Sequence, residues 1–118
     1  MNEPLPLSDK IFIGRKTQSD NIVEVDRGDG DVTALDIKKS LEVVQHSTRF
    51  TWGWHNRNSE GHAQLAAALL YEVTGNDNVE IARTYYQLFR LERVIYFKST
   101  FEISEYQIRC WLQDVGGI

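Results

Sequence analysis

The chain has 118 residues, a formal net charge of −4 and a pI near 5.3. Its composition, 42% hydrophobic and 25% charged, excludes a disordered chain and is typical of one domain with a single core. The acidic balance argues against broad nucleic-acid binding, which needs clustered Lys and Arg. The single cysteine, Cys110, excludes an intramolecular disulfide and a CxxC zinc site.

The expected location is the cytoplasm. The first residues lack the basic start and apolar core of a secretion signal. No apolar run reaches the roughly 18 residues that a membrane-spanning helix needs. A lone cysteine also fits a reducing compartment, so we expect a cytoplasmic protein without a membrane partner.

A flexible arm over residues 1–9, which contain both prolines, is predicted to precede a single domain over residues 10–118. The domain begins with two predicted strands, at residues 10–15 and 22–25, where β-branched residues are frequent. The polar stretch between them is short. These strands are expected to form a β-hairpin.

The sequence DRGDGD at residues 26–31 predicts a tight turn, because its glycines accept positive φ and its aspartates form Asx-type hydrogen bonds. A calcium loop is the less favoured alternative, since the EF-hand spacing is absent. The RGD tripeptide is a weak indication of adhesion. A third strand is predicted from Leu41 to Gln45, after a short helical turn or strand edge at residues 36–40.

Three helices are predicted in the second half of the chain. The first runs from 59 to 74, and Gly75 can take the left-handed conformation that ends a helix. The second runs from 77 to about 96. The third follows Ser104, whose spacing to Gln107 predicts a capping box. The sequence thus predicts an α+β fold: a small N-terminal antiparallel β-hairpin or sheet packed on a three-helix C-terminal region.

The aromatic stretch FTWGW at residues 50–54 carries two of the three tryptophans. Trp52 and Trp54 flank Gly53, so in an extended segment both indoles would project on one side. That arrangement would make a stacking platform for a base, a nucleotide or a side chain of a partner. The alternative is that both rings pack over the helix that follows.

Titratable groups concentrate just after the aromatic stretch. They are His55, Arg57, Glu60 and His62. The histidines and Glu60 could ligate a metal ion, and the helix N-terminus could hold an anion with the help of Arg57. No diagnostic metal spacing is present, and His62 shares a face with apolar helix residues, which favours a buried, hydrogen-bonded histidine. Gln64 is expected to hydrogen-bond back to the aromatic turn and fix the loop.

A series of short motifs lies in order along roughly residues 10–115. They are His46-Ser47, Phe50-x-Trp52-Gly53-Trp54, Gly61-x-x-Gln64-Leu65-Ala66, Ala68-Leu69-Leu70, Thr74-Gly75, Tyr86-Gln87-x-Phe89-Arg90, Ile103-Ser104 and Ile108-Arg109-x-Trp111-Leu112. Through these motifs the chain resembles a small uncharacterised bacterial domain family that recurs in phage and plasmid genomes.

The chain departs from this family pattern in its loop. Trp54 stands where tyrosine is usual, His62 where proline is usual, and the connection at residues 55–60 is longer and polar. The resemblance implies a fold and a mobile-element setting, and it brings no activity with it.

The predicted function is a non-enzymatic intracellular binding protein of phage or mobile-element type, with inhibition of a host defence system as its narrower form. A protein partner is favoured; a small molecule, a nucleotide or a second copy of the chain are the alternatives. A small enzyme that uses the loop from His55 to His62, and a dimeric structural module, are the other hypotheses. No catalytic residue, cofactor or metal is predicted. The residues predicted to bind are Trp52, Trp54, His55, Arg57, His46, Arg49 and His62.

Overall fold

The computed structural model describes residues 10–18, 20–28, 30–54, 59–75 and 79–118; the predicted arm at 1–9 lies outside them. The elements, in chain order, are β1 (Ile11–Lys16), β2 (Asn21–Asp26), β3 (Val32–Ala34), α1 (Ile37–Ser40), α2 (Ser59–Thr74), α3 (Val79–Glu92), the 3-10 helix η2 (Val94–Tyr96), β4 (Phe101–Ser104) and α4 (Glu105–Asp114).

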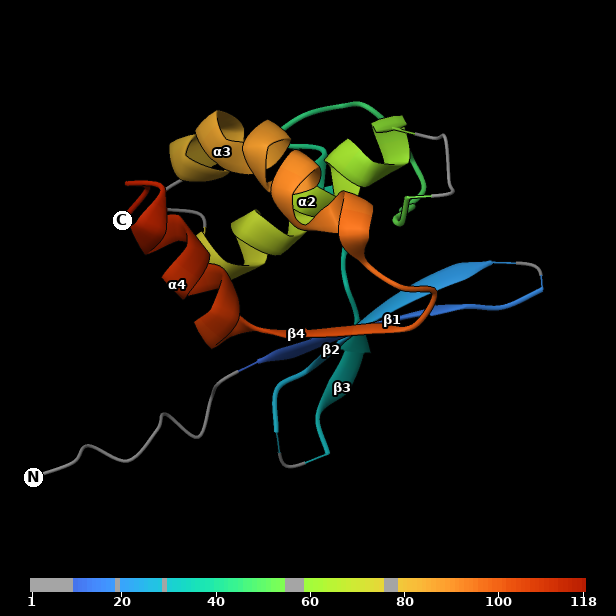
Figure 1. The fold of residues 1–118 in the computed structure, drawn as a ribbon. Coiled ribbons are helices and arrows are strands. Elements are labelled where there is room, and N and C mark those ends of the chain that lie inside the picture. The colour runs from blue at the N-terminus through green and yellow to red at the C-terminus, as the bar shows by residue number, and fades with distance from the viewer. Residues whose placement is uncertain (1–9, 19, 29, 55–58, 76–78) are drawn as a thin grey trace, which may run out of the picture.

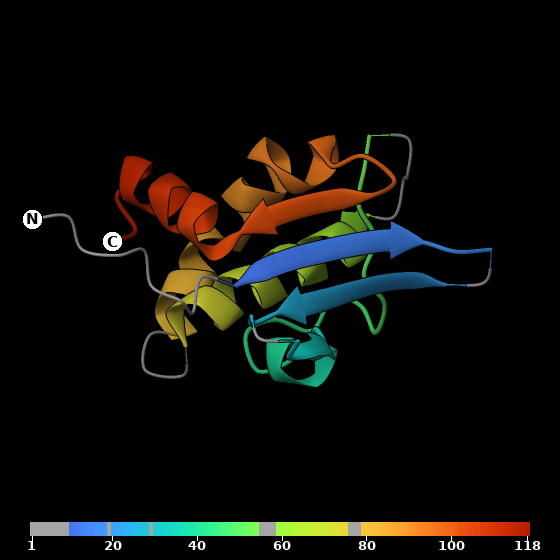
Figure 2. The same ribbon diagram turned by 90° about the horizontal axis from the view of Figure 1, so that it is seen from below.

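The four strands form one antiparallel sheet in the order β3-β2-β1-β4. Figure 1 shows the helices gathered on one face of this sheet, and Figure 2 shows α2 crossing behind it. The α+β prediction is therefore confirmed, with a larger sheet and, among the described residues, four α-helices in place of three.

Side chains alternate across the sheet as the pleat requires. Phe12 is paired with Val25 on one side and with Ile103 on the other, and all three are buried beneath the helices. Ile11 and Ile13, which point the other way, are only half-buried. One face of the sheet is thus core and the other is open to solvent.

Gly14 gives the sheet room for an aromatic ring. It is paired with Phe101 of β4, and a Cβ built on Gly14 would overlap the Phe101 ring. That ring packs edge-on against Trp52, with ring centroids 5.0 Å apart, and stacks on Phe97 at 4.3 Å. The missing side chain in β1 therefore allows the sheet to contact the aromatic segments directly.

Helix α2 forms the centre of the core. Every residue from Gly61 to Tyr71 is buried, so this helix has no solvent face over three turns. Its bounds match the prediction, and Gly75, with φ of 77°, follows its end as expected. Within the described part of the chain, no helix is long and apolar enough to cross a membrane.

The other helices match the prediction less closely. The capping box of α4 is present, since the Ser104 side chain accepts from the Gln107 amide and the Gln107 side chain accepts from the Ser104 amide. Helix α3 ends at Glu92 because the backbone turns at Arg93 (φ −131°, ψ −58°), which places Val94 of η2 in the core. The predicted start of α3 at residue 77 lies outside the described residues.

The predicted strand at residues 41–45 is wrong. A turn at residues 41–43 directly follows the short helix α1, and the amides of Val43 and Val44 both donate to the carbonyl oxygen of Ser40. Strands β3 and β4 were not predicted, because in three or four residues the alternation of apolar and polar side chains is too short to be recognised as a strand. The turn at 26–31 is confirmed, with the Asp31 amide donating to the Gly28 carbonyl oxygen at 2.9 Å.

Gln64 on α2 holds this irregular segment in place. Its Oε1 accepts hydrogen bonds from the amides of His46 and Ser47, at 2.9 and 3.1 Å. Its Nε2 donates to Ser40 Oγ at 2.7 Å and to the Val44 carbonyl oxygen at 3.0 Å. The side chain is fully buried. The predicted hydrogen bond from Gln64 to the aromatic turn is therefore wrong, because Gln64 binds the segment at residues 40–47 that precedes that turn.

Replacing Gln64 with leucine should lower the free energy of unfolding by about 3 kcal/mol, because the buried amides of His46 and Ser47 lose their acceptor. Urea denaturation monitored by circular dichroism measures this change. Gln113→Leu is the matched control, since Gln113 is exposed on α4 and should change stability by less than about 0.5 kcal/mol. Equal effects of the two substitutions would contradict the role assigned to Gln64.

Candidate functional site

The turn at residues 51–54 is held by a buried histidine. His62 on α2 is 2% exposed, and its Nδ1 lies 2.7 Å from Thr51 Oγ1 while its Nε2 lies 2.9 Å from the Gly53 carbonyl oxygen. Gly61 allows the close approach, because a Cβ at this position would overlap the Thr51 side chain. His62 therefore joins the turn to the central helix and is not part of a surface.

Gly53 directs the two flanking tryptophans to opposite environments. Its φ of 100° is left-handed, a conformation that glycine accepts readily. The expectation that both indoles project on one side assumed an extended segment and is wrong. Trp52 is fully buried, whereas the side chain of Trp54 is 65% exposed.

Trp52 belongs to the core. Its Nε1 donates to the carbonyl oxygens of Lys98 and Ser99, at 2.9 and 3.3 Å. Lys16 Nζ donates to the Trp52 carbonyl oxygen at 3.1 Å and lies 5.4 Å from the centroid of its ring. Trp52 thus anchors the segment between η2 and β4, and it positions Lys16 at the end of β1.

Trp54 stacks on an aromatic side chain from another element. The Gly53 amide donates to the Val94 carbonyl oxygen at 3.2 Å, which joins the turn to η2. Tyr96, at the end of η2, then lies against Trp54, with ring centroids 5.9 Å apart and planes inclined by 14°. Tyr96 is also 65% exposed.

A pocket of about 350 Å³ adjoins this stacked pair, and it is lined by Lys16, Gly53, Trp54, Tyr96, Phe97, Lys98 and Ser99. We call the side chains of Trp54, Tyr96, Lys16 and Lys98 the aromatic patch. Neither lysine forms an ion pair with any residue that the structure describes. The patch therefore presents aromatic surface and positive charge together on a protein of net negative charge.

The groups of the aromatic patch can contact a bound molecule in two ways. Indole and phenol rings contribute large contact areas and stack on planar groups, and ammonium groups attract carboxylates or phosphates. Among the described residues, no three His, Cys, Asp or Glu side chains are grouped to hold a metal ion. His62 has both ring nitrogens engaged in the interior, so it is not placed to act as a ligand or base for a bound molecule.

The remaining predicted binding residues do not join the patch. His46 Nε2 lies 2.9 Å from the hydroxyl of Tyr86 on α3, and Arg49 lines a different pocket beside β2. His55 and Arg57 lie outside the described residues. Among those predicted binding residues that the structure describes, Trp54 alone belongs to the aromatic patch.

Two tyrosines elsewhere have perturbed acidities. Burial of the Tyr71 side chain, and secondarily the nearby Glu42 carboxylate, raises the pKa of its phenol. A hydrogen bond with Cys110 raises the pKa of Tyr106 on the surface of α4. Neither residue lines the pocket of the aromatic patch.

Comparison with known families matches residues 12–114 to a family of unknown function, DUF6166. The chain belongs to this family. The match extends from β1 to the end of α4, so the DUF6166 domain is the whole fold described above. The resemblance to an uncharacterised domain family is confirmed at this level. No curated protein and no solved structure matches the chain.

Sequence reasoning missed Tyr96, Lys16 and Lys98. Tyr96 was assigned to the end of a helix and Lys16 lay just beyond a predicted strand, so neither had a pattern of its own. No local signal identifies these residues, because long-range hydrogen bonds bring them to the turn: the Gly53 amide donates to Val94, Trp52 Nε1 donates to Lys98, and Lys16 donates to Trp52.

Trp54 should dominate the collisional quenching of tryptophan fluorescence, because Trp52 and Trp111 are at most 3% exposed. Relative to the quenching of free N-acetyltryptophanamide by each ion, which corrects for the lower intrinsic efficiency of caesium, iodide should quench more strongly than caesium, since Lys16 and Lys98 attract the anion. Stern–Volmer titrations of the wild type and of Trp54→Phe measure both effects. The substitution should remove most of the quenching; equal quenching by the two ions would contradict the charge assigned to the patch.

Replacing His62 with phenylalanine should lower the free energy of unfolding by about 2 kcal/mol, because Thr51 Oγ1 and the Gly53 carbonyl oxygen lose a buried partner. Thermal or urea denaturation measures the loss. His46→Phe is the control and should cost less than about 1 kcal/mol, since His46 is only half-buried. A stability unchanged in His62→Phe would show that the turn does not depend on this residue.

Proposed function

We propose that this DUF6166 domain is a non-enzymatic binding protein that uses the aromatic patch to hold an acidic protein partner. The observation that carries the proposal is the stacked pair of Trp54 and Tyr96, each 65% exposed beside two lysines without ion pairs among the described residues. Inhibition of a host defence protein by a phage or plasmid product is the narrower form of this proposal.

The exposure of the pair supports the proposal. Clusters of large exposed apolar side chains often mark interaction sites, and tryptophan and tyrosine are among the residues most enriched at binding hot spots. Trp54 and Tyr96 come from two separate elements that the Gly53 to Val94 hydrogen bond joins. Their contact surface is therefore formed before a partner arrives, which lowers the entropy lost on binding.

The local charge supports an acidic partner. Lys16 is tethered by its hydrogen bond to the Trp52 carbonyl oxygen, and Lys98 lines the same pocket. Two positive charges on a chain of net charge −4 would steer an acidic surface to this face and repel it elsewhere. The contact should therefore weaken as salt screens the charges.

The two other hypotheses receive less support. An enzyme that uses the loop from His55 to His62 would need a free His62, and this side chain is engaged in the interior. A nucleotide could stack on Trp54 with its phosphates near the lysines, but among the described residues that line the pocket the only hydroxyl side chain besides Tyr96 is that of Ser99. A homodimer would have to bring the lysines of two copies together.

The test is affinity capture from a lysate of the organism that encodes the chain, followed by mass spectrometry. The wild type is compared with a Trp54→Ala, Tyr96→Ala double variant and with Tyr106→Ala, a control that removes another 60% exposed tyrosine. A protein recovered by the wild type and the control, and at least about tenfold depleted with the double variant, is the expected result.

Circular dichroism confirms that all three proteins are folded, and sedimentation over a range of concentrations tests self-association. Equal recovery of every captured protein by the three baits, or recovery of none, would contradict the proposal. A mass that doubles with concentration in the wild type but not in the double variant would replace it with the dimeric module.

A further inference from the structure

Strand β3 covers only half of the neighbouring edge of β2. The two strands are paired from Glu24 to Asp26, and beyond them the Leu35 amide donates to the Val23 carbonyl oxygen at 2.9 Å. Backbone groups alternate between the two edges of a strand, so Asn21 presents its peptide groups to the same edge as Val23. Within the described residues, no strand is paired with this edge beyond Leu35.

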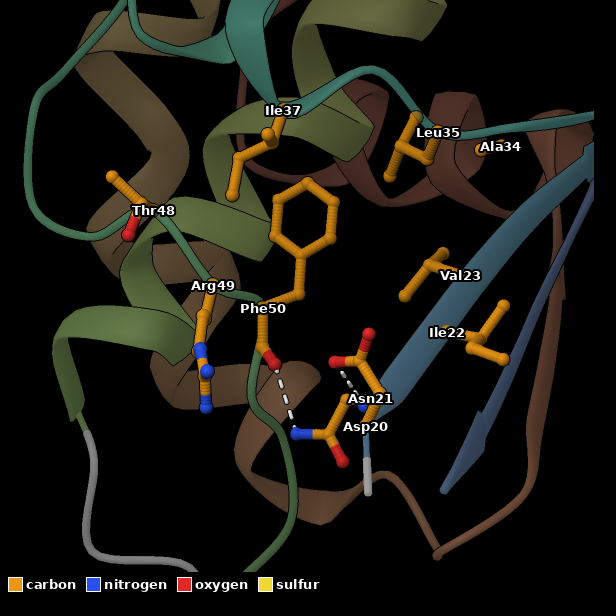
Figure 3. Close-up of a pocket in the computed structure, with 10 residues that line it drawn as sticks. All are labelled: Asp20, Asn21, Ile22, Val23, Ala34, Leu35, Ile37, Thr48, Arg49 and Phe50. Carbon is orange, nitrogen blue, oxygen red and sulfur yellow. Dashed lines mark hydrogen bonds between the residues drawn. The ribbon is translucent and has the colours of Figure 1, made fainter. Parts of the chain in front are cut away.

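A pocket of about 400 Å³ lies against this open edge (Figure 3). Its wall opposite β2 is the segment at residues 48–50. Figure 3 shows the ring of Phe50 between Ile37 on one side and Leu35 with Val23 on the other. The inner part of the pocket is therefore apolar and can accept one aliphatic side chain.

A hydrogen bond across the pocket fixes its width. Asn21 Nδ2 donates to the Phe50 carbonyl oxygen at 3.0 Å, and the Phe50 side chain is 8% exposed. The strand edge and the facing segment are thus joined at one end of the pocket. The site exists before any ligand is present, which favours binding of a chain that must itself become ordered.

The rim of the pocket is charged. Arg49 is exposed and forms no ion pair with the residues that the structure describes. Asp20, on the strand side, accepts a hydrogen bond from the Asn21 amide at 2.8 Å. Arg49 is therefore the group available to a ligand, and its charge selects a carboxylate.

The other two free edges of the sheet are less suited to a ligand. Strand β3 is exposed along its length, and none of its outer positions adjoins the pocket except Ala34. The outer edge of β4 has its Ser104 amide occupied by the capping box of α4. In the part of the chain that the structure describes, an open strand edge, an apolar pocket and an arginine without an ion pair coincide only at Asn21 to Val23.

We propose that this edge binds an extended peptide segment of a partner protein, which adds a strand beside β2. The peptide places one aliphatic side chain in the pocket, between Phe50 and Val23, and one acidic side chain on Arg49. The Val23 carbonyl oxygen and the Asn21 amide already have partners, so the peptide accepts from the Val23 amide and donates to the Asn21 carbonyl oxygen. These main-chain hydrogen bonds supply affinity, and the pocket and Arg49 supply specificity. This site is separate from the aromatic patch, and the proposal does not depend on the function proposed for that patch.

The probe is a library of random linear peptides selected on the immobilised wild-type domain. The selected sequences should alternate apolar and polar residues and carry Asp or Glu at a fixed distance from the aliphatic residue. Methylation of the peptide nitrogen that donates to the Asn21 carbonyl oxygen should weaken the best peptide at least about tenfold, because it removes a main-chain donor. Methylation of the adjacent nitrogens, which face away from β2, should leave its affinity unchanged.

A charge exchange tests the contact with Arg49. Arg49→Glu should weaken binding about tenfold, and replacing the acidic residue of the peptide with lysine should restore it in this variant. Arg93→Glu is the matched control, since Arg93 is exposed and does not line this pocket. Trp54→Ala is the control for the aromatic patch. Both controls should bind like the wild type.

Amide exchange of the peptide complex gives an independent measurement, since the Val23 amide should become protected when a strand is added. The proposal is overturned if no peptide is selected, if methylation of that nitrogen and of the adjacent ones has the same effect, or if Trp54→Ala abolishes binding. Loss of the aromatic-patch partner in the capture experiment leaves these peptide results unchanged, so the two proposals fail separately.

Discussion

The fold depends on buried polar side chains of α2 that satisfy backbone groups outside the helix. Gln64 binds the segment at residues 40–47 and His62 binds the turn at 51–54, and the structure leaves no described side-chain polar atom buried without a partner. Neither bound segment is regular, so without these two side chains its peptide groups would be costly to bury. A fully buried helix thus specifies the path of the chain around it.

The aromatic patch follows from this constraint. His62 fixes Thr51 and Gly53, the backbone of Gly53 binds η2, and the two exposed rings come together as a result. The pocket beside β2 has a similar origin, since Phe50 is drawn into the core and its carbonyl oxygen accepts from Asn21. The aromatic patch and the pocket beside β2 are thus both built on the irregular segment at residues 48–54, which His62 of α2 holds in place.

The sequence predicts those parts of the fold in which local signals and tertiary packing agree. Helix α2 and the capping box of α4 are examples, because apolar continuity and cap residues mark them clearly. Leu41 to Gln45 has the composition of a strand, yet Gln64, distant in sequence, binds it in another conformation. The positions of Tyr96 and Lys98 depend on such long-range hydrogen bonds, so no local pattern reveals them. Trp54 was predicted as a binding residue from its local motif, but its exposure beside a buried Trp52 follows from the positive φ of Gly53, which the motif alone does not give.

The contact between Gly14 and Phe101 has a consequence for how this domain can vary. A side chain on β1 and a ring on β4 cannot occupy the same volume, and the Phe101 ring also supports Trp52 and Phe97. A change at either position is tolerated only with a compensating change at the other. Positions 14 and 101 should therefore covary among members of the family. Glycine at position 14 should accompany a large ring at position 101, and a bulkier residue at 14 should accompany a smaller side chain at 101.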